Sequence, residues 1–209
     1  MRMNGDMTMS GEMATVMRTD NRASRLRVVP VYAASAETGR SSGCVAVIDV
    51  DGLLVNRNLS GVGSFGENPV ALFREKLDAI SCCEDIAAIV LRINSPGGGV
   101  TAADMMTRDL HQLAAQRQIP VVACLMDVGA GGAYYLAAGC DRILAHPTSV
   151  VGGIGVLLNV YNMEDGLAQF GIVAIPVKSG ELIDMASPQR VMEQQERDLL
   201  QGIADQFHE

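Results

Sequence analysis

DIAAIVLRINSPGGGV, residues 85–100, joins a run of apolar residues to a turn of three consecutive glycines. The apolar run over residues 86–93 is typical of a buried strand in a parallel sheet. The glycines favour a tight turn, because glycine adopts positive φ and lets the backbone approach a neighbour closely. The stretch therefore predicts a strand that ends in a glycine turn. Such a turn either only connects the strand to a helix or also presents backbone N–H groups to a carbonyl oxygen.

A second glycine turn follows further along the chain. Residues 121–126, VVACLM, predict another strand, and Gly129-Ala130-Gly131-Gly132-Ala133 predicts a turn that opens a helix. N–H groups at a helix N-terminus carry partial positive charge. Two such turns at adjacent strand ends can form an oxyanion hole. The glycines do not form a dinucleotide-binding motif, which needs an acidic residue at the end of the following strand.

Strands and helices alternate through the rest of the chain, which predicts an α/β fold with a mainly parallel sheet flanked by helices. Asn68 and Pro69 form a helix cap and first helical position, and Ser187 and Pro188 repeat this pattern near the C-terminus. The predicted strands also include residues 44–50 and 172–180, and the predicted helices cover residues 69–82, 101–116 and the segment after Ser187.

Length, charge and the composition of the N-terminus indicate the domain organisation and limit the kinds of partner. Residues 1–40 show no clear period, so we expect a flexible arm over 1–40 and one α/β domain over 41–209. The net charge of −8 argues against a nucleic acid partner, which needs a basic face. The sequence shows neither a long apolar run nor a secretory leader. We therefore expect a cytoplasmic or peripheral protein whose membrane association is only indirect.

The cysteines argue against a disulfide framework and a zinc site. Their number is odd, and no two of them have CxxC spacing. We expect free thiols, no metal and no cofactor. The five are Cys44, Cys82, Cys83, Cys124 and Cys140.

Four motifs occur in an order that resembles the signal peptide peptidase A (protease IV) family of serine peptidases. They are INSPGG at 93–98, DVGAGGAYYLAAGCDRILAHP at 127–147, VVGGIGV at 150–156 and KSGELIDMASPQR at 178–190. The resemblance runs from about Cys44 to Glu209. It implies a Clp protease/crotonase-like fold, a ββα-type spiral, and assembly into rings or domes. Members usually continue beyond the helix where this chain stops, so we expect a truncated C-terminus.

Three positions depart from the chemistry that the resemblance implies. The nucleophilic serine of the family falls on Gly131, and the serine that supports the base falls on Gly153. The lysine that acts as general base falls on Ile183. Glycine has no nucleophile and isoleucine accepts no proton, whereas peptide hydrolysis by this mechanism needs both groups. The resemblance thus implies a family member without an intact catalytic dyad. The oxyanion or peptide-binding positions that remain are Gly97, Gly98 and Gly132.

Few other residues could replace the missing groups. Lys178 lies five positions before Ile183, which is a large displacement for a catalytic group. Ser95 belongs to the first turn, and the family does not use it as a nucleophile. Cys124 falls within a predicted strand and fits the core. The histidines match no catalytic position of the family; they are His111, His146 and His208.

Three hypotheses about function remain. The first is a pseudo-peptidase that binds a peptide or an unfolded protein segment, as a homo-oligomer or mixed with an active paralogue. The second is a crotonase-like enzyme that stabilises a thioester enolate of an acyl-CoA in the oxyanion hole, although Tyr135 stands where such enzymes often have a glutamate. The third is a residual or atypical serine-type peptidase or other hydrolase with an unrecognised nucleophile.

Overall fold

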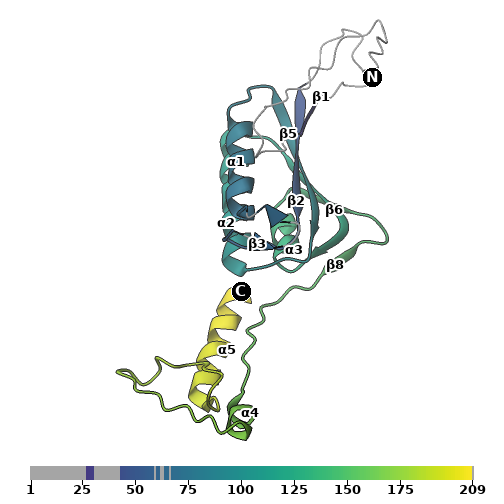
Figure 1. The fold of residues 1–209 in the computed structure, drawn as a ribbon. Coiled ribbons are helices and arrows are strands. Elements are labelled where there is room, and N and C mark those ends of the chain that lie inside the picture. Colours follow the sequence, from purple (N-terminus) through teal and green to yellow (C-terminus); the bar gives the residue numbers. More distant parts are fainter. Residues whose placement is uncertain (1–26, 31–42, 59, 62–63, 66, 209) are drawn as a thin grey trace, which may run out of the picture. The chain divides into compact units, whose positions relative to one another are not determined.

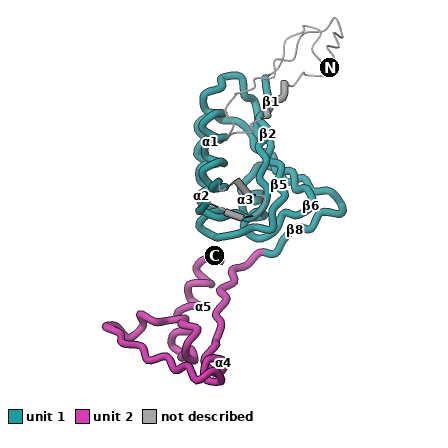
Figure 2. The backbone as a smooth tube through the Cα atoms, viewed as in Figure 1, with its two compact units in different colours: residues 1–153 teal, residues 154–209 magenta. Residues whose placement is uncertain are grey.

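The computed structural model describes residues 27–30, 43–58, 60–61, 64–65 and 67–208. The chain separates into two compact units, an N-terminal unit over residues 1–153 and a C-terminal unit over residues 154–209 (Figure 2). Most of the predicted arm over 1–40 lies outside the described residues. The predicted division into an arm and one domain over 41–209 stays a prediction.

The N-terminal unit alternates strands and helices, as Figure 1 shows. Its helices are α1 (Pro69–Ser81), α2 (Val100–Arg117) and α3 (Gly132–Ala138). Its strands are β1 (Arg27–Pro30), β2 (Cys44–Asp51), β3 (Ser60–Gly61), β4 (Ser64–Phe65), β5 (Ile86–Ser95), β6 (Val121–Ala130), β7 (Arg142–Ala145) and β8 (Val150–Gly152).

The main sheet has the strand order β1-β2-β5-β6-β7, and β8 also pairs with β6. All its pairings are parallel except that of β1 with β2. Because each parallel pairing needs a crossover, α1 connects the region of β2 to β5 and α2 connects β5 to β6. The predicted α/β class, with a mainly parallel sheet flanked by helices, is confirmed.

Alternating residues of the strands form one contiguous apolar core with the helices. Along β5, Ile89, Leu91 and Ile93 are fully buried, while the residues between them are partly exposed. This alternation follows from the two-residue period of a strand. The other large side chains of the core include Ile48, Leu54, Phe73, Leu77, Ile80, Met106, Leu110, Leu125 and Leu136.

The predicted cap fixes the start of α1. The Asn68 side-chain oxygen accepts from the backbone N–H groups of Val70 at 3.0 Å and Ala71 at 3.4 Å, and Pro69 is the first helical residue. These bonds satisfy N–H groups that have no partner within the helix. The sequence therefore specifies this helix start locally.

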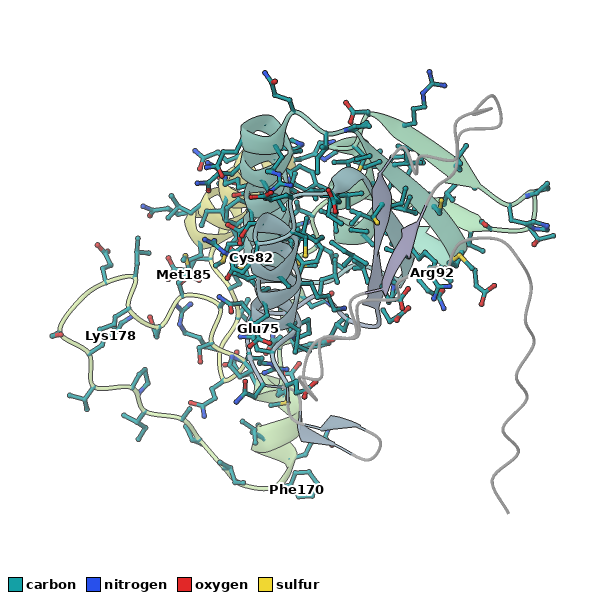
Figure 3. All side chains as sticks on the ribbon, turned by 90° about the horizontal axis from the view of Figure 1, so that it is seen from above. Glu75, Cys82, Arg92, Phe170, Lys178 and Met185 are labelled. Atoms are coloured by element: carbon teal, nitrogen blue, oxygen red, sulfur yellow. The ribbon has the colours of Figure 1, made fainter. Side chains whose placement is uncertain are left out.

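The C-terminal unit contains α4 (Glu164–Gln169) and α5 (Gln194–His208). No hydrophobic side chain among its described residues is buried; Phe170, for example, is 82% exposed (Figure 3). Residues 172–180, predicted as a strand, have no strand pairing in the structure, so that prediction is wrong. A run of β-branched residues forms a strand only where a second backbone completes its hydrogen bonds.

The last helix begins later than the cap pattern predicts. Ser187 accepts a hydrogen bond from the Gln189 N–H at 3.3 Å, which forms a local turn, and α5 starts only at Gln194. Serine followed by proline favours turns as well as helix starts, because the serine hydroxyl can bond the backbone two residues on. Ser187 and Pro188 therefore form a turn and do not cap the helix that was predicted to start there.

Candidate functional site

The two glycine turns lie side by side at the ends of neighbouring strands. Ser95, the last residue of β5, stands in register with Gly129, near the end of β6. The parallel pairing of these strands places both turns at one edge of the sheet. Helix α2 starts after the first turn and α3 starts after the second, so two helix N-termini also lie at this edge.

Gly97 and Gly98 make backbone contacts that exclude any side chain. A Cβ atom on Gly97, whose φ is +96°, would lie 2.7 Å from both the Ala130 oxygen and the Gly132 nitrogen. A Cβ atom on Gly98 would lie 2.0 Å from the Leu54 oxygen. Leu54 donates to the Gly97 oxygen at 2.9 Å and accepts from the Gly99 N–H at 2.8 Å. The first turn therefore packs between the segment at Leu54 and the second turn.

The amides of Gly98 and Gly132 form a pair without a protein acceptor. A Cβ atom on Gly132 would lie 3.6 Å from the Gly98 nitrogen, so the two residues are close neighbours. Within the described part of the chain, neither N–H donates to a protein oxygen. Two neighbouring amides that have no acceptor and lie near helix starts can bind one carbonyl oxygen or oxyanion. The structure thus brings together Gly97, Gly98 and Gly132, the three positions predicted for this role.

Gly131, at the predicted nucleophile position, has an unusual backbone. Its φ is 52° and its ψ is −126°, a combination that L-residues with a side chain rarely adopt. Its N–H donates to the Gly152 oxygen at 2.9 Å. A Cβ atom would meet nothing closer than the Pro96 oxygen at 3.4 Å. There is room for a side chain at this position, although its backbone would be strained. Glycine itself supplies no attacking atom.

Gly153, predicted at the place of the supporting serine, lies beside Gly131. The pairing of β6 with β8 sets Ala130 opposite Gly152. A Cβ atom on Gly153 would lie 3.7 Å from the Gly131 nitrogen, with φ at +65°. The structure therefore brings these two predicted positions together and leaves both without a functional group.

Ile183, at the predicted base position, belongs to the C-terminal unit. Its side chain is 71% exposed and carries no group that can accept a proton. Lys178 does not substitute for the base within this unit. Its ammonium group donates to Asp184 Oδ1 at 2.9 Å and to the Glu181 oxygen at 3.1 Å. The nearest lysine in the sequence is thus occupied by an ion pair.

Ser95 holds the first turn in place and offers no free hydroxyl. It is completely buried, and its Oγ donates to the Gly52 oxygen at 2.6 Å. The same Oγ accepts from the Gly97 N–H at 3.1 Å. The hydroxyl proton is already donated to the Gly52 carbonyl oxygen, which makes Ser95 a structural residue of the turn.

We expect Ser95→Ala to lower the free energy of unfolding by about 1–3 kcal/mol, because it removes the partner of the Gly52 oxygen and of the buried Gly97 N–H. Ser81→Ala is the control, since that hydroxyl makes an exposed bond to the Asp78 oxygen and its loss should change stability by less than about 0.5 kcal/mol. Urea unfolding measures both. Equal stability of the two variants would show that the Ser95 bonds do not hold the turn.

The other residues considered as substitutes do not converge on the glycine turns. Cys124 is half-buried in β6 between the core residues Ala123 and Leu125 and does not belong to the core, so the prediction of a core position is wrong. His111 bonds the Gly139 oxygen at 2.6 Å between α2 and α3, and His146 bonds Thr148 at 2.7 Å in a local turn. Among the described residues, no three His, Cys, Asp or Glu side chains are grouped so that they could hold a metal ion.

The C-terminal unit contains a cluster of charged side chains that the sequence does not predict. Arg190 lies between Asp184 and Glu196 and bonds both carboxylates. The guanidinium of Arg190 and the ammonium of Lys178 hold the pKa of Asp184 well below its usual range, and Arg190 also lowers the pKa of Glu196. Spacings of six residues follow neither helical nor strand periodicity, so no sequence signal indicates this cluster.

Every helix among the described residues is either too short or too polar to span a membrane.

Comparisons with known proteins support the family resemblance of the motifs. Residues 114–209 match the model of peptidase family S49. The chain is 28% identical over 165 residues, 79% of its length, to an Enterococcus faecium protein named as a signal peptide peptidase SppA. It is 28% identical over 162 residues, 77% of its length, to protease 4 of Salmonella typhi. It spans only 48% and 25% of the lengths of these two relatives.

A solved structure, a serine-to-alanine variant of the membrane-bound stomatin-specific protease 1510-N, aligns with 56% of this chain and 50% of its own. The TM-score is 0.42 and the identity 19%. The match over residues 114–209 and the sequence relatives support the assignment of the chain to the signal peptide peptidase A (protease 4) family of serine peptidases, peptidase family S49.

Proposed function

We propose that this chain is a non-catalytic member of its family that binds a peptide or an unfolded protein segment without cutting it. The observation that carries the proposal is the pair of unpaired amides at Gly98 and Gly132 beside Gly131, which has no attacking atom. Amides that would stabilise an oxyanion can equally bind the carbonyl oxygen of an intact peptide. Hydrolysis would still need a nucleophile and a base.

The proposed partners are an unfolded protein segment and further subunits. The subunits would be copies of this chain or an active paralogue. Exposed apolar side chains in the C-terminal unit support an association, because a unit without buried hydrophobic residues gains stability by covering them. Light scattering of the purified chain, alone and with an active relative, measures the assembly.

A binding experiment tests the central proposal. We expect a fluorescein-labelled, reduced and carboxymethylated α-lactalbumin to bind saturably in fluorescence anisotropy and to remain intact on gels. Gly153→Leu should weaken binding at least about tenfold, because its side chain would extend beside the Gly131 amide.

The matched control is Gly171→Leu. Gly171 has nearly the same φ, +70° against +65°, and nothing lies within 4 Å of a Cβ there. Both variants therefore carry similar backbone strain, and only the first obstructs the turns. Cleavage of the labelled protein by the natural chain would overturn the non-catalytic proposal. Binding that both variants weaken equally would remove the glycine turns from the binding site.

One alternative function has an observation in its favour. Paired amides without a nucleophile also suit an enzyme that stabilises a thioester enolate. Thermal stabilisation by acetyl-CoA or butyryl-CoA, without stabilisation by CoA itself, would support the crotonase-like alternative over peptide binding.

A further inference from the structure

The pairing of β5 with β6 is irregular just before the glycine turns. Between Ile93 and Ser95, β5 has a single residue, Asn94. Between the partners of those two residues, β6 has three, 126–128. Extra residues of this kind form a β-bulge, which bends the strand and redirects the chain that follows it. The bulge of β6, residues 126–128, thus lies directly before the second glycine turn.

Asn94 bonds the supports of both glycine turns. Its side-chain Oδ1 accepts from the Val128 N–H at 3.2 Å, which ties the last residue of the bulge to β5. Its backbone oxygen accepts from the Gly52 N–H at 3.1 Å, and the Gly52 oxygen in turn accepts from the Ser95 hydroxyl that holds the first turn. Asn94 is exposed, so the hydrogen bond and not core packing fixes its side chain.

The length of the bulge decides which residues of β6 reach the first turn. A Cβ atom on Gly97 would lie 2.7 Å from both the Ala130 oxygen and the Gly132 nitrogen, so the two turns fit together without spare room. A slip of one residue moves a strand by about 3.3 Å and turns its groups to the opposite face. The Gly132 amide would then leave its place beside the Gly98 amide. The register at the bulge therefore sets the amide pair.

We propose that Asn94 is a positioning residue that holds the bulge of β6 and thereby keeps the Gly132 amide beside the Gly98 amide. This inference rests on the proposed function for its ligand, a carbonyl oxygen of an unfolded segment, but not for the positioning itself. Two donors bind one carbonyl oxygen well only where both keep their distance and direction, and a displacement of a fraction of an ångström weakens such bonds.

Removal of the acceptor oxygen tests the positioning. Asn94→Ala should raise amide hydrogen exchange at Val128 at least about tenfold and shift the ¹⁵N–¹H resonance of Gly132. Asn94→Asp keeps an acceptor oxygen at the same place and should leave both as in the natural chain. Affinity for the labelled α-lactalbumin should fall about fivefold in Asn94→Ala, the equivalent of one net hydrogen bond, and less than about twofold in Asn94→Asp.

Asn162→Ala is the matched control. Asn162 is also exposed, and its Oδ1 accepts a backbone N–H, that of Glu164 at 2.9 Å, in the C-terminal unit. Its replacement should change neither the Gly132 resonance nor the affinity. Both alanine variants should unfold at similar urea concentrations, because each loses one exposed hydrogen bond.

Unchanged exchange at Val128 and an unchanged Gly132 resonance in Asn94→Ala would overturn the positioning role, as would equal changes in Asn94→Asp. A loss of affinity without a change at Gly132 would mean that Asn94 contacts the ligand itself, which also contradicts the proposal. If the natural chain binds no labelled protein, the peptide-binding function fails, whereas the exchange and resonance measurements still decide the positioning.

Discussion

The triple variant Gly131→Ser, Gly153→Ser, Ile183→Lys is expected to cleave unfolded α-lactalbumin that the natural chain leaves intact. The change places a serine, a serine and a lysine where the motif order predicts the family's nucleophile, its supporting hydroxyl and its general base. A Cβ atom at Gly131 would clear its nearest neighbour, the Pro96 oxygen, by 3.4 Å, and the paired amides are already present. We expect cleavage to exceed that of the natural chain by at least about 10²-fold, because nucleophile and base act as a unit. Release of fluorescent fragments measures it.

The matched control replaces only the nucleophile. Gly131→Ala, combined with the same two other substitutions, carries the same backbone strain at φ 52° and has no hydroxyl. Equal cleavage by this control would indicate another nucleophile or a contaminating peptidase. A triple variant that folds and binds but does not cleave would contradict the assignment of these three positions from the motif order.

Gly98→Ala is expected to lower the free energy of unfolding by on the order of 3 kcal/mol and to abolish binding of the labelled protein. Its Cβ atom would lie 2.0 Å from the Leu54 oxygen, which is backbone and cannot move aside cheaply. The segment at Leu54 or the first glycine turn must shift, and the Gly98 amide shifts with it. Urea unfolding and fluorescence anisotropy measure the two effects.

Gly99→Ala is the control for this substitution. A Cβ atom on Gly99 would lie 3.9 Å from the same Leu54 oxygen, an ordinary contact, and Gly99 has an extended backbone with φ −71°. We expect its stability to change by less than about 1 kcal/mol. If Gly98→Ala is as stable as Gly99→Ala, the close approach of the first turn to Leu54 does not exist in solution.

The strand and helix pattern of the N-terminal unit could be predicted from the sequence because its signals are local. Asn68 and Pro69 mark the start of α1 within four residues, and the glycine turns are visible as short motifs. The pattern failed in the C-terminal unit. There, residues 172–180 have the composition of a strand but no partner, and Ser187 closes a turn instead of capping a helix.

For the candidate site too, the sequence predicts one part and only the structure shows the other. The motif order of the family and the residues at Gly131 and Ile183 are enough to predict that the nucleophile and the base are missing. That the Gly98 and Gly132 amides lie together without acceptors depends on two turns 34 positions apart in numbering meeting at one sheet edge. No motif carries that information.

The residues alone predict the α/β class, the family and the glycine and isoleucine at its catalytic positions, because short-range periodicity, glycine turns and side-chain chemistry are all local properties. Only the folded chain reveals that Ser95 is locked to Gly52 and that Arg190 joins Asp184 to Glu196. Such contacts depend on how the chain returns on itself, and buried polar groups must find partners wherever the fold places them.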